Sequence, residues 1–162
     1  MSGSRKLLII SGVLLAMWGM SFGLYYALFV EHQTLDEIGG SLAAGFRHGA
    51  EGDLMAAKES LQGYADKQFV YVRSVDVHSH WTGLAMLLIV FGVAFDRVGP
   101  TEGRRMLLAL SLVIGSAAFP LGVMLQTLDR GIIPQAVAAI GAGLVIIALA
   151  AIALGFARSG RD

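Results

Sequence analysis

The residues of this chain best suited to chemistry are its four histidines, His32, His48, His78 and His80. The chain contains no cysteine, which excludes disulfides, iron–sulfur clusters, thiolate zinc sites, covalently attached haem and thiol nucleophiles. A metal ion or a haem would therefore be held by histidine, methionine or carboxylate side chains. His48 stands apart from the others, because it lies next to Gly49 on an expected surface helix.

The spacing of His78 and His80 allows two kinds of site, depending on the local backbone. In a helix, a step of about 100° per residue sends the two imidazoles to opposite sides. That arrangement favours one imidazole per haem iron, with the second axial ligand from another helix, for which His32 is the candidate. In an extended segment, both side chains point the same way and would chelate one copper or zinc ion. Asp76, four residues before His80, would accept an imidazole N–H and orient the ring.

The same residues also have ordinary structural explanations. Histidines at a membrane surface can simply bridge headgroups and water, and Asp76 can cap a helix. Trp81, with Tyr25 and Tyr26, is typical of the aromatic belt at a membrane interface. Against these explanations, ionisable side chains at membrane depth are costly and tend to be kept for a function.

The segment from Val77 to Gly92, which opens with His78-Ser-His80, resembles the haem-ligating helices of haem–copper oxidase and nitric oxide reductase catalytic subunits. It also resembles small four-span membrane proteins with a His-x-His at the start of the second span. The resemblance covers about one span in four and implies binding of a b-type haem by His78 or His80. The further intramembrane histidines of the oxidases are missing, so oxygen reduction is not implied.

The elements that position these histidines are membrane spans. The chain is 56% hydrophobic and 15% charged, with a mean hydropathy of +0.68, whereas about a quarter of the residues in a soluble protein are charged. We predict an all-α fold of four transmembrane helices in one domain, residues 1–162. The apolar runs place the spans at about 7–30, 78–96, 105–128 and 132–157. The second run is short, which draws Asp76, His78 and His80 to the membrane boundary.

The basic residues near the span ends set the orientation. One side carries a net charge of +4 and the other −4, counted from the Lys, Arg, Asp and Glu residues outside the four runs. The positive side is expected to face the cytoplasm. Both termini would then be cytoplasmic in a multi-pass protein of the bacterial inner membrane, and all four histidines would lie on the outer side.

Residues 31–76 form an extracytoplasmic insert between the first two spans. Leu35, Ile38, Leu42 and Phe46 recur at helical spacing, and so do Leu54, Ala57, Leu61 and Tyr64 after a possible N-cap at Asp53. Two such amphipathic helices must cover the bundle or dock on a partner. Residues 69–77 fit either an upward extension of the second span or a strand-like linker, and we favour the helix.

Two functions of different classes remain. The first is a small membrane protein that binds haem b, or copper as the alternative, near its outer face and assists respiratory electron transfer. The second is a cofactor-free scaffold or accessory subunit that docks a partner through its outer helices. The expected partners are the lipid bilayer, other redox subunits and further copies of the chain. Zero net charge without a basic tract argues against nucleic acid, and no catalytic motif indicates an enzyme acting on its own.

Overall fold

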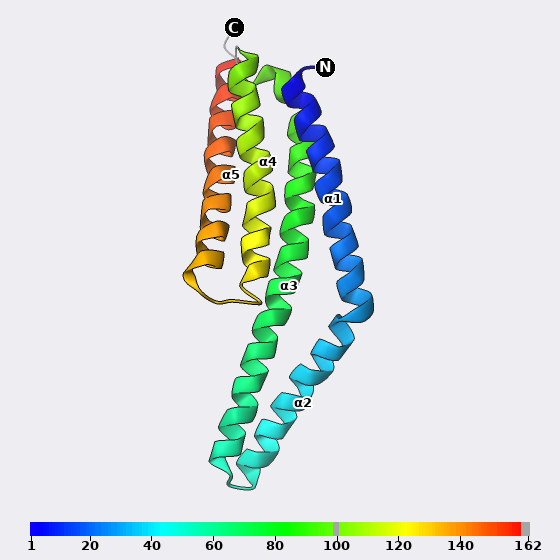
Figure 1. The fold of residues 1–162 in the computed structure, drawn as a ribbon, viewed down its shortest axis with the longest axis vertical. Helices are drawn as coiled ribbons and strands as arrows, with labels where there is room; N and C mark the ends of the chain where they lie inside the picture. Colours follow the sequence, from blue (N-terminus) through cyan, green and yellow to red (C-terminus); the bar gives the residue numbers. More distant parts are fainter. Residues whose placement is uncertain (99–100, 160–162) are drawn as a thin grey trace.

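The structure is a computed structural model in which residues 1–98 and 101–159 are described. Its elements are α1 (Gly3–Phe29), α2 (Glu31–Ala50), α3 (Leu54–Ala94), the short 3-10 helix η1 (Phe95–Arg97), α4 (Glu102–Leu125) and α5 (Ile132–Ser159) (Figure 1). Four of them, α1, α3, α4 and α5, are long and apolar enough to cross a membrane. The predicted all-α bundle with a helical insert is therefore confirmed.

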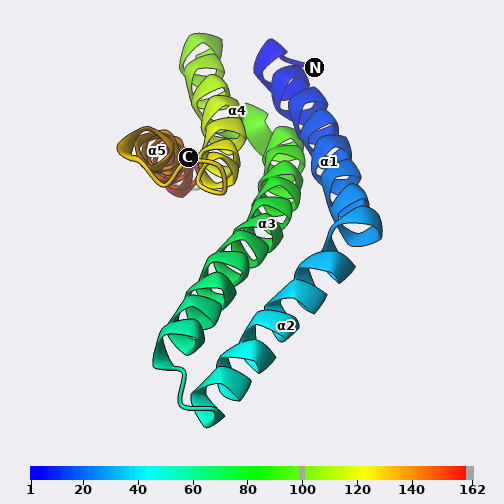
Figure 2. The same cartoon turned by 60° about the horizontal axis from the view of Figure 1, so that its bottom comes forward.

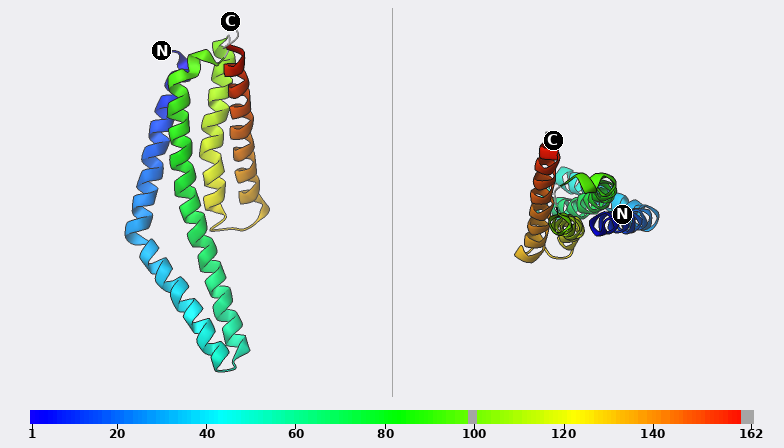
Figure 3. Two further views of the ribbon diagram at one scale, coloured as in Figure 1. Left: turned by 180° about the vertical axis from the view of Figure 1, so that it is seen from behind. Right: turned by 90° about the horizontal axis from the view of Figure 1, so that it is seen from above.

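The four long helices lie in an open row rather than in a closed square. α1 packs along α3, α5 packs along α4, and the two pairs meet where α4 contacts α3 and α1. Figure 2 and the right-hand view of Figure 3 show α1 at one edge of this row and α5 at the other. One core cluster joins all four helices through Leu8, Leu88, Leu112 and Ile152, which are almost completely buried.

The α4–α5 pair is held at short range by glycine. A Cβ atom added at Gly122 would collide with the backbone of Ala138, and one added at Gly141 would collide with the backbone of Phe119. Between helices in lipid there is no hydrophobic driving force for association, so close backbone contact stabilises the pair through van der Waals packing. Gly122 and Gly141 therefore join α4 to α5.

The insert does not fold as a unit separate from the spans, because its second helix continues directly into the second span. α3 runs for 41 residues without interruption, so residues 69–77 are helical and the strand-like alternative is wrong. α2 folds back along the first part of α3, and the two form a helical hairpin (residues 31–76) that projects beyond the α4–α5 connection (Figure 1, Figure 3). The side chains of the second span thus continue the register of the hairpin.

The opposite end of the bundle, where α1 begins, is called the base. Asp96 accepts hydrogen bonds from Ser2 Oγ at 2.7 Å and from Arg5 Nη1 at 2.8 Å. Glu102 accepts from the backbone N–H of Ser4 at 2.8 Å. The hydrogen bond from Ser2, followed by that from Arg5, holds the pKa of Asp96 below its usual value. These contacts tie α1, η1 and α4 together.

Candidate functional site

His78 lies in the interface between α3 and α1. Its Nδ1 is 2.9 Å from the carbonyl oxygen of Gly19, so the ring donates this N–H to the backbone of the other helix. A Cβ atom at Gly23 would collide with the imidazole. The Gly19-x-x-x-Gly23 pair of α1 therefore makes the space that the His78 ring fills.

The neighbours of His78 complete this contact. Thr82 donates its hydroxyl to the His78 carbonyl at 2.9 Å, and a Cβ atom at Gly19 would lie 3.3 Å from Thr82 Oγ1. Trp81 is only 3% exposed, and its ring meets Trp18 and Phe22 edge to face at 5.9 and 5.5 Å. Trp81 is thus part of the helix interface and not of an aromatic belt. The sequence signal that could have shown this is that the apolar Val77 and Ala85 each lie four residues from Trp81, on one stripe of the helix.

His80 faces the other side of α3. Its ring meets Phe119 of α4 edge to face, with 4.6 Å between the ring centroids and 75° between the planes. Its Nδ1 is 2.6 Å from the carbonyl oxygen of Asp76, one helical turn earlier. The two histidines therefore point away from each other, as the helical alternative predicts, and the shared His-x-His chelate of the extended alternative is not formed.

The expected role of Asp76 requires a correction. Its backbone carbonyl, and not its carboxylate, receives the His80 N–H. The carboxylate lies 3.5 Å from Arg73 Nη1. Side chains on a helix point back toward its N-terminus, so the imidazole reaches the carbonyl of the preceding turn while the Asp76 side chain reaches back to Arg73.

His32 is exposed in the first turn of α2, just after the chain changes direction at Val30. In the described part of the chain, no three His, Asp or Glu side chains gather in a way that could hold a metal ion. The convergence of His32 with His78 and His80 is therefore not seen there. His48 lies at the far end of α2, 3.6 Å from the carboxylate of Glu51.

These positions test whether a haem or copper fits. In both His78 and His80 the Nδ1 atom is hydrogen-bonded to a backbone carbonyl oxygen, which leaves Nε2 as the atom able to bind a metal ion or a haem iron. The rings lie on opposite sides of α3, however, and the backbone of α1 closes the His78 side. A site in which both histidines hold one metal or one haem iron does not fit this geometry.

The tip of the hairpin is a second candidate site. Phe46, Leu54 and Met55 lie around the α2–α3 turn and are 71%, 75% and 80% exposed. The turn itself needs Gly52, whose φ is +81°, a backbone conformation that glycine adopts without strain. Periodicity identified Leu54 and Phe46 as apolar positions but did not show that the folded chain leaves them uncovered.

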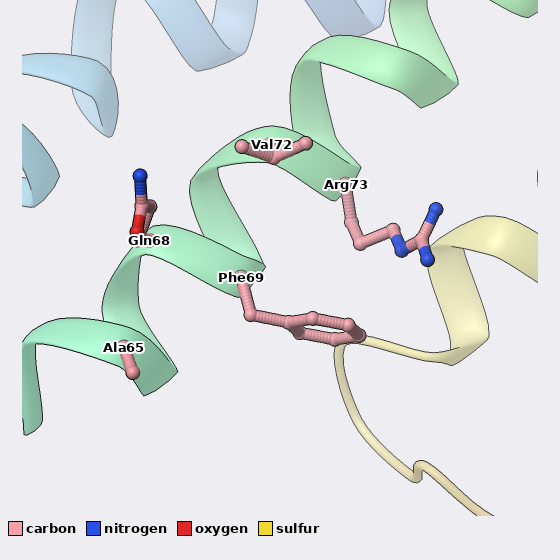
Figure 4. A pocket seen from close by; sticks show the side chains of 5 residues that line it. All are labelled: Ala65, Gln68, Phe69, Val72 and Arg73. Atoms are coloured by element: carbon pink, nitrogen blue, oxygen red, sulfur yellow. The ribbon is translucent and has the colours of Figure 1, made fainter. Parts of the chain in front are cut away.

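The hairpin is braced against the rest of the molecule from one side. In the α4–α5 connection, Arg130 forms an ion pair with Asp66 at 2.9 Å and lies 4.3 Å from the Phe69 ring centroid. Figure 4 shows Phe69 and Arg73 directed toward this side of α3. These contacts hold α3 in a fixed position where it leaves the bundle.

Comparison of the chain with protein-family models, with curated proteins and with solved structures finds no match.

Proposed function

We propose that this chain is a membrane-anchored docking protein that presents the tip of its hairpin to another protein outside the bilayer. One observation carries the proposal. The single helix α3, about 60 Å long at roughly 1.5 Å per residue, runs from the tip to the base and ends in exposed apolar side chains. Such a helix holds a binding surface at a fixed distance from the membrane.

The chemistry of the tip supports protein binding. Large apolar side chains that gather on a water-exposed surface mark interaction sites, and aromatic residues and methionine are enriched in protein interfaces. Phe46, Leu54 and Met55 supply this kind of surface. The hairpin carries eight acidic and four basic residues, so it belongs in water and not in lipid.

The interior of the molecule supports the same function. The contact of His78 with Gly19 and Gly23 joins α3 to α1, and at the base Asp96 joins α1 to η1, which directly follows α3. A force on the hairpin is thereby passed to the membrane spans and not absorbed in a loose linker. The charge asymmetry favours an inner-membrane protein with the hairpin in the periplasm and both termini in the cytoplasm.

Photo-crosslinking in native membranes tests the docking function. A photoreactive residue at Phe46 or Met55 is expected to trap one defined protein, whose purified form then binds the detergent-solubilised chain. The double variant Phe46→Ala, Met55→Ala should weaken that binding at least about tenfold, as loss of a buried anchor does. Gln62→Ala, an exposed polar change on the same hairpin, is the matched control. Unchanged affinity of the double variant would overturn the proposal.

A b-type haem, with copper as the alternative, is the second candidate, in service of respiratory electron transfer. The observation in its favour is the Nδ1-to-carbonyl bond of His80, the arrangement that orients metal-bound histidines. The group would be held by one imidazole and completed by another protein. Reduced-minus-oxidised absorption and metal content of the purified chain, compared with His80→Ala and His78→Ala, decide it. A colourless, metal-free preparation from cells supplied with haem and copper would remove this candidate.

A further inference from the structure

One side of the hairpin carries a largely apolar surface, called the lateral face, which the exposed Gln68 interrupts. Its members are Leu35 and Leu42 of α2 and Leu61, Ala65, Val72 and Val75 of α3. Leu35, Leu61, Val72 and Val75 are between 40% and 46% exposed. On α2 this surface runs on toward the tip at the α2–α3 turn, because Phe46 lies four residues after Leu42.

The contacts within the hairpin define where the lateral face lies. α2 meets α3 through Gly45 against Leu61 and through Ser41 and Glu37 against Lys67. At about 100° per residue, Val75 lies about a quarter turn from Lys67, and Val72 and Ala65 lie further round, toward the side of α3 opposite α2. On α2, Leu35 and Leu42 lie to one side of the residues that contact α3. This is the same side of the hairpin on which Val72 and Val75 lie.

The described residues outside the hairpin leave the lateral face uncovered. The α4–α5 connection reaches the hairpin on another side of α3, through Arg130 and Asp66. The side opposite the lateral face is polar, and its shallow hollow is lined by residues such as Glu37, Gly40 and Glu59. Ala65, Gln68 and Val72 line one edge of a hollow at the border of the lateral face, and Phe69 and Arg73, on the side of the α4–α5 connection, line its other edge (Figure 4).

We propose that the lateral face binds the lateral face of a second copy, so that two hairpins form a four-helix bundle outside the membrane. Two copies anchored in one bilayer point the same way, and their hairpins project to the same height. Every apolar side chain on one copy therefore finds its counterpart at the same level on the other. A two-fold axis along the membrane normal makes such a contact self-complementary and closed.

Four members of the lateral face, Leu35, Leu61, Val72 and Val75, keep 40% to 46% of their surface exposed in one copy. A second copy would cover this apolar surface, and polar residues around it would supply the rest of the roughly 800 Å² that each partner gives to a standard interface. The same side of α3 continues into the membrane through Ser79, Gly83 and Met86. A Cβ atom at Gly83 would meet nothing within 4 Å, so the spans leave room for a close approach of the two copies.

The absence of cysteine from the sequence makes the contact testable by crosslinking. Ala65→Cys places one thiol on the lateral face, and Gly40→Cys, in open space on the polar side, is the matched control. On mild oxidation in native membranes, Ala65→Cys is expected to give at least tenfold more disulfide-linked dimer than Gly40→Cys. Equal yields from the two sides would indicate random collision and would overturn the proposal.

A charged side chain introduced on the lateral face provides a second test of the dimer. Val72→Glu in the Ala65→Cys background is expected to reduce the dimer yield at least tenfold, while circular dichroism shows the helix content unchanged. The mass of the unsubstituted chain in mild detergent should be twice that of one copy, and a monomer mass would also overturn the proposal. The dimer yield is measured with the native Phe46 and Met55 in place, whereas the tip test measures binding of a second protein, so failure of one proposal does not decide the other.

Discussion

At the scale of single residues, the histidine with the clearest role is His78, and that role is the joining of two helices. Its ring fills the space left by Gly23 and donates to the carbonyl of Gly19. A partly buried polar ring of this kind stabilises only while its partner is present, because a buried donor left unsatisfied costs up to about 1–3 kcal/mol. The fit between His78 and the glycines of α1 is therefore expected to control stability.

Gly23→Ala should destabilise the chain, since the new methyl group collides with the imidazole and overpacking costs about 1–3 kcal/mol. The midpoint of thermal unfolding in detergent, followed by circular dichroism, measures the loss. Gly143→Ala in α5, where the added Cβ meets nothing within 4 Å, is the control and should leave the midpoint unchanged or raise it. If His78 is the cause, adding His78→Ala to Gly23→Ala recovers part of the loss, and no recovery would contradict this explanation.

Sequence reasoning placed His78 and His80 on opposite sides of a helix but could not name what each ring meets. The partners of His78 are glycines about 60 residues earlier in the chain, and glycine in a span has no side chain to signal a contact. The partner of His80 is its own helix carbonyl, which any residue type at position 76 would supply. For that reason the carboxylate of Asp76 was assigned a role that the backbone performs.

At the scale of elements, the conformation of residues 69–77 in α3 was the main question that the sequence did not decide. Hydrophobic periodicity located both its amphipathic half and its apolar half. Residues 69–77 are apolar with weak alternation, and such a run fits a strand or a helix. The helix prevails because α1 and α2 together offer packing along nearly its whole length, a tertiary effect that local sequence does not contain.

The base contacts lead to a prediction at this scale, because they join α1, η1 and α4 through Asp96. The folded chain lowers the pKa of Asp96 relative to its ordinary value of 3.8. Its ionised form thus contributes stability above that value, and the contribution is lost as the pH falls through the lower folded pKa. The unfolding midpoint of the native chain should exceed that of Asp96→Asn at pH 7, with the gap closing as the pH falls toward 3.

Ser2→Ala is the companion variant, since the hydrogen bond from Ser2 is the largest cause of the lowered pKa. It should raise the pKa of Asp96 in the folded chain, while Arg5 still contacts the carboxylate. The difference in unfolding midpoint between the chain with Asp96 and the Asp96→Asn variant should then disappear over a narrower pH range. A gap between the native chain and Asp96→Asn that stays constant from pH 7 to pH 3 would show that ionisation of Asp96 does not contribute.

At the scale of the whole molecule, span number, insert and overall helical class all followed from composition and periodicity. The open row of helices did not, because the pairing of α1 with α3 and of α4 with α5 depends on glycines that contact other helices. Sequence patterns show which faces are small or apolar. They do not show which of several equivalent faces meet.

The orientation of the whole molecule is open to a direct test, again because the chain lacks cysteine. Gln62→Cys on the exposed hairpin and Gly103→Cys near the base place one thiol at each end. The base carries the excess of arginine and lysine, which the cytoplasmic side retains. A membrane-impermeant thiol reagent, applied to cells whose outer barrier is opened but whose inner membrane is intact, should label Gln62→Cys alone, and Gly103→Cys only after lysis. The reverse pattern would place the hairpin in the cytoplasm, where its tip and lateral face would meet a different set of proteins.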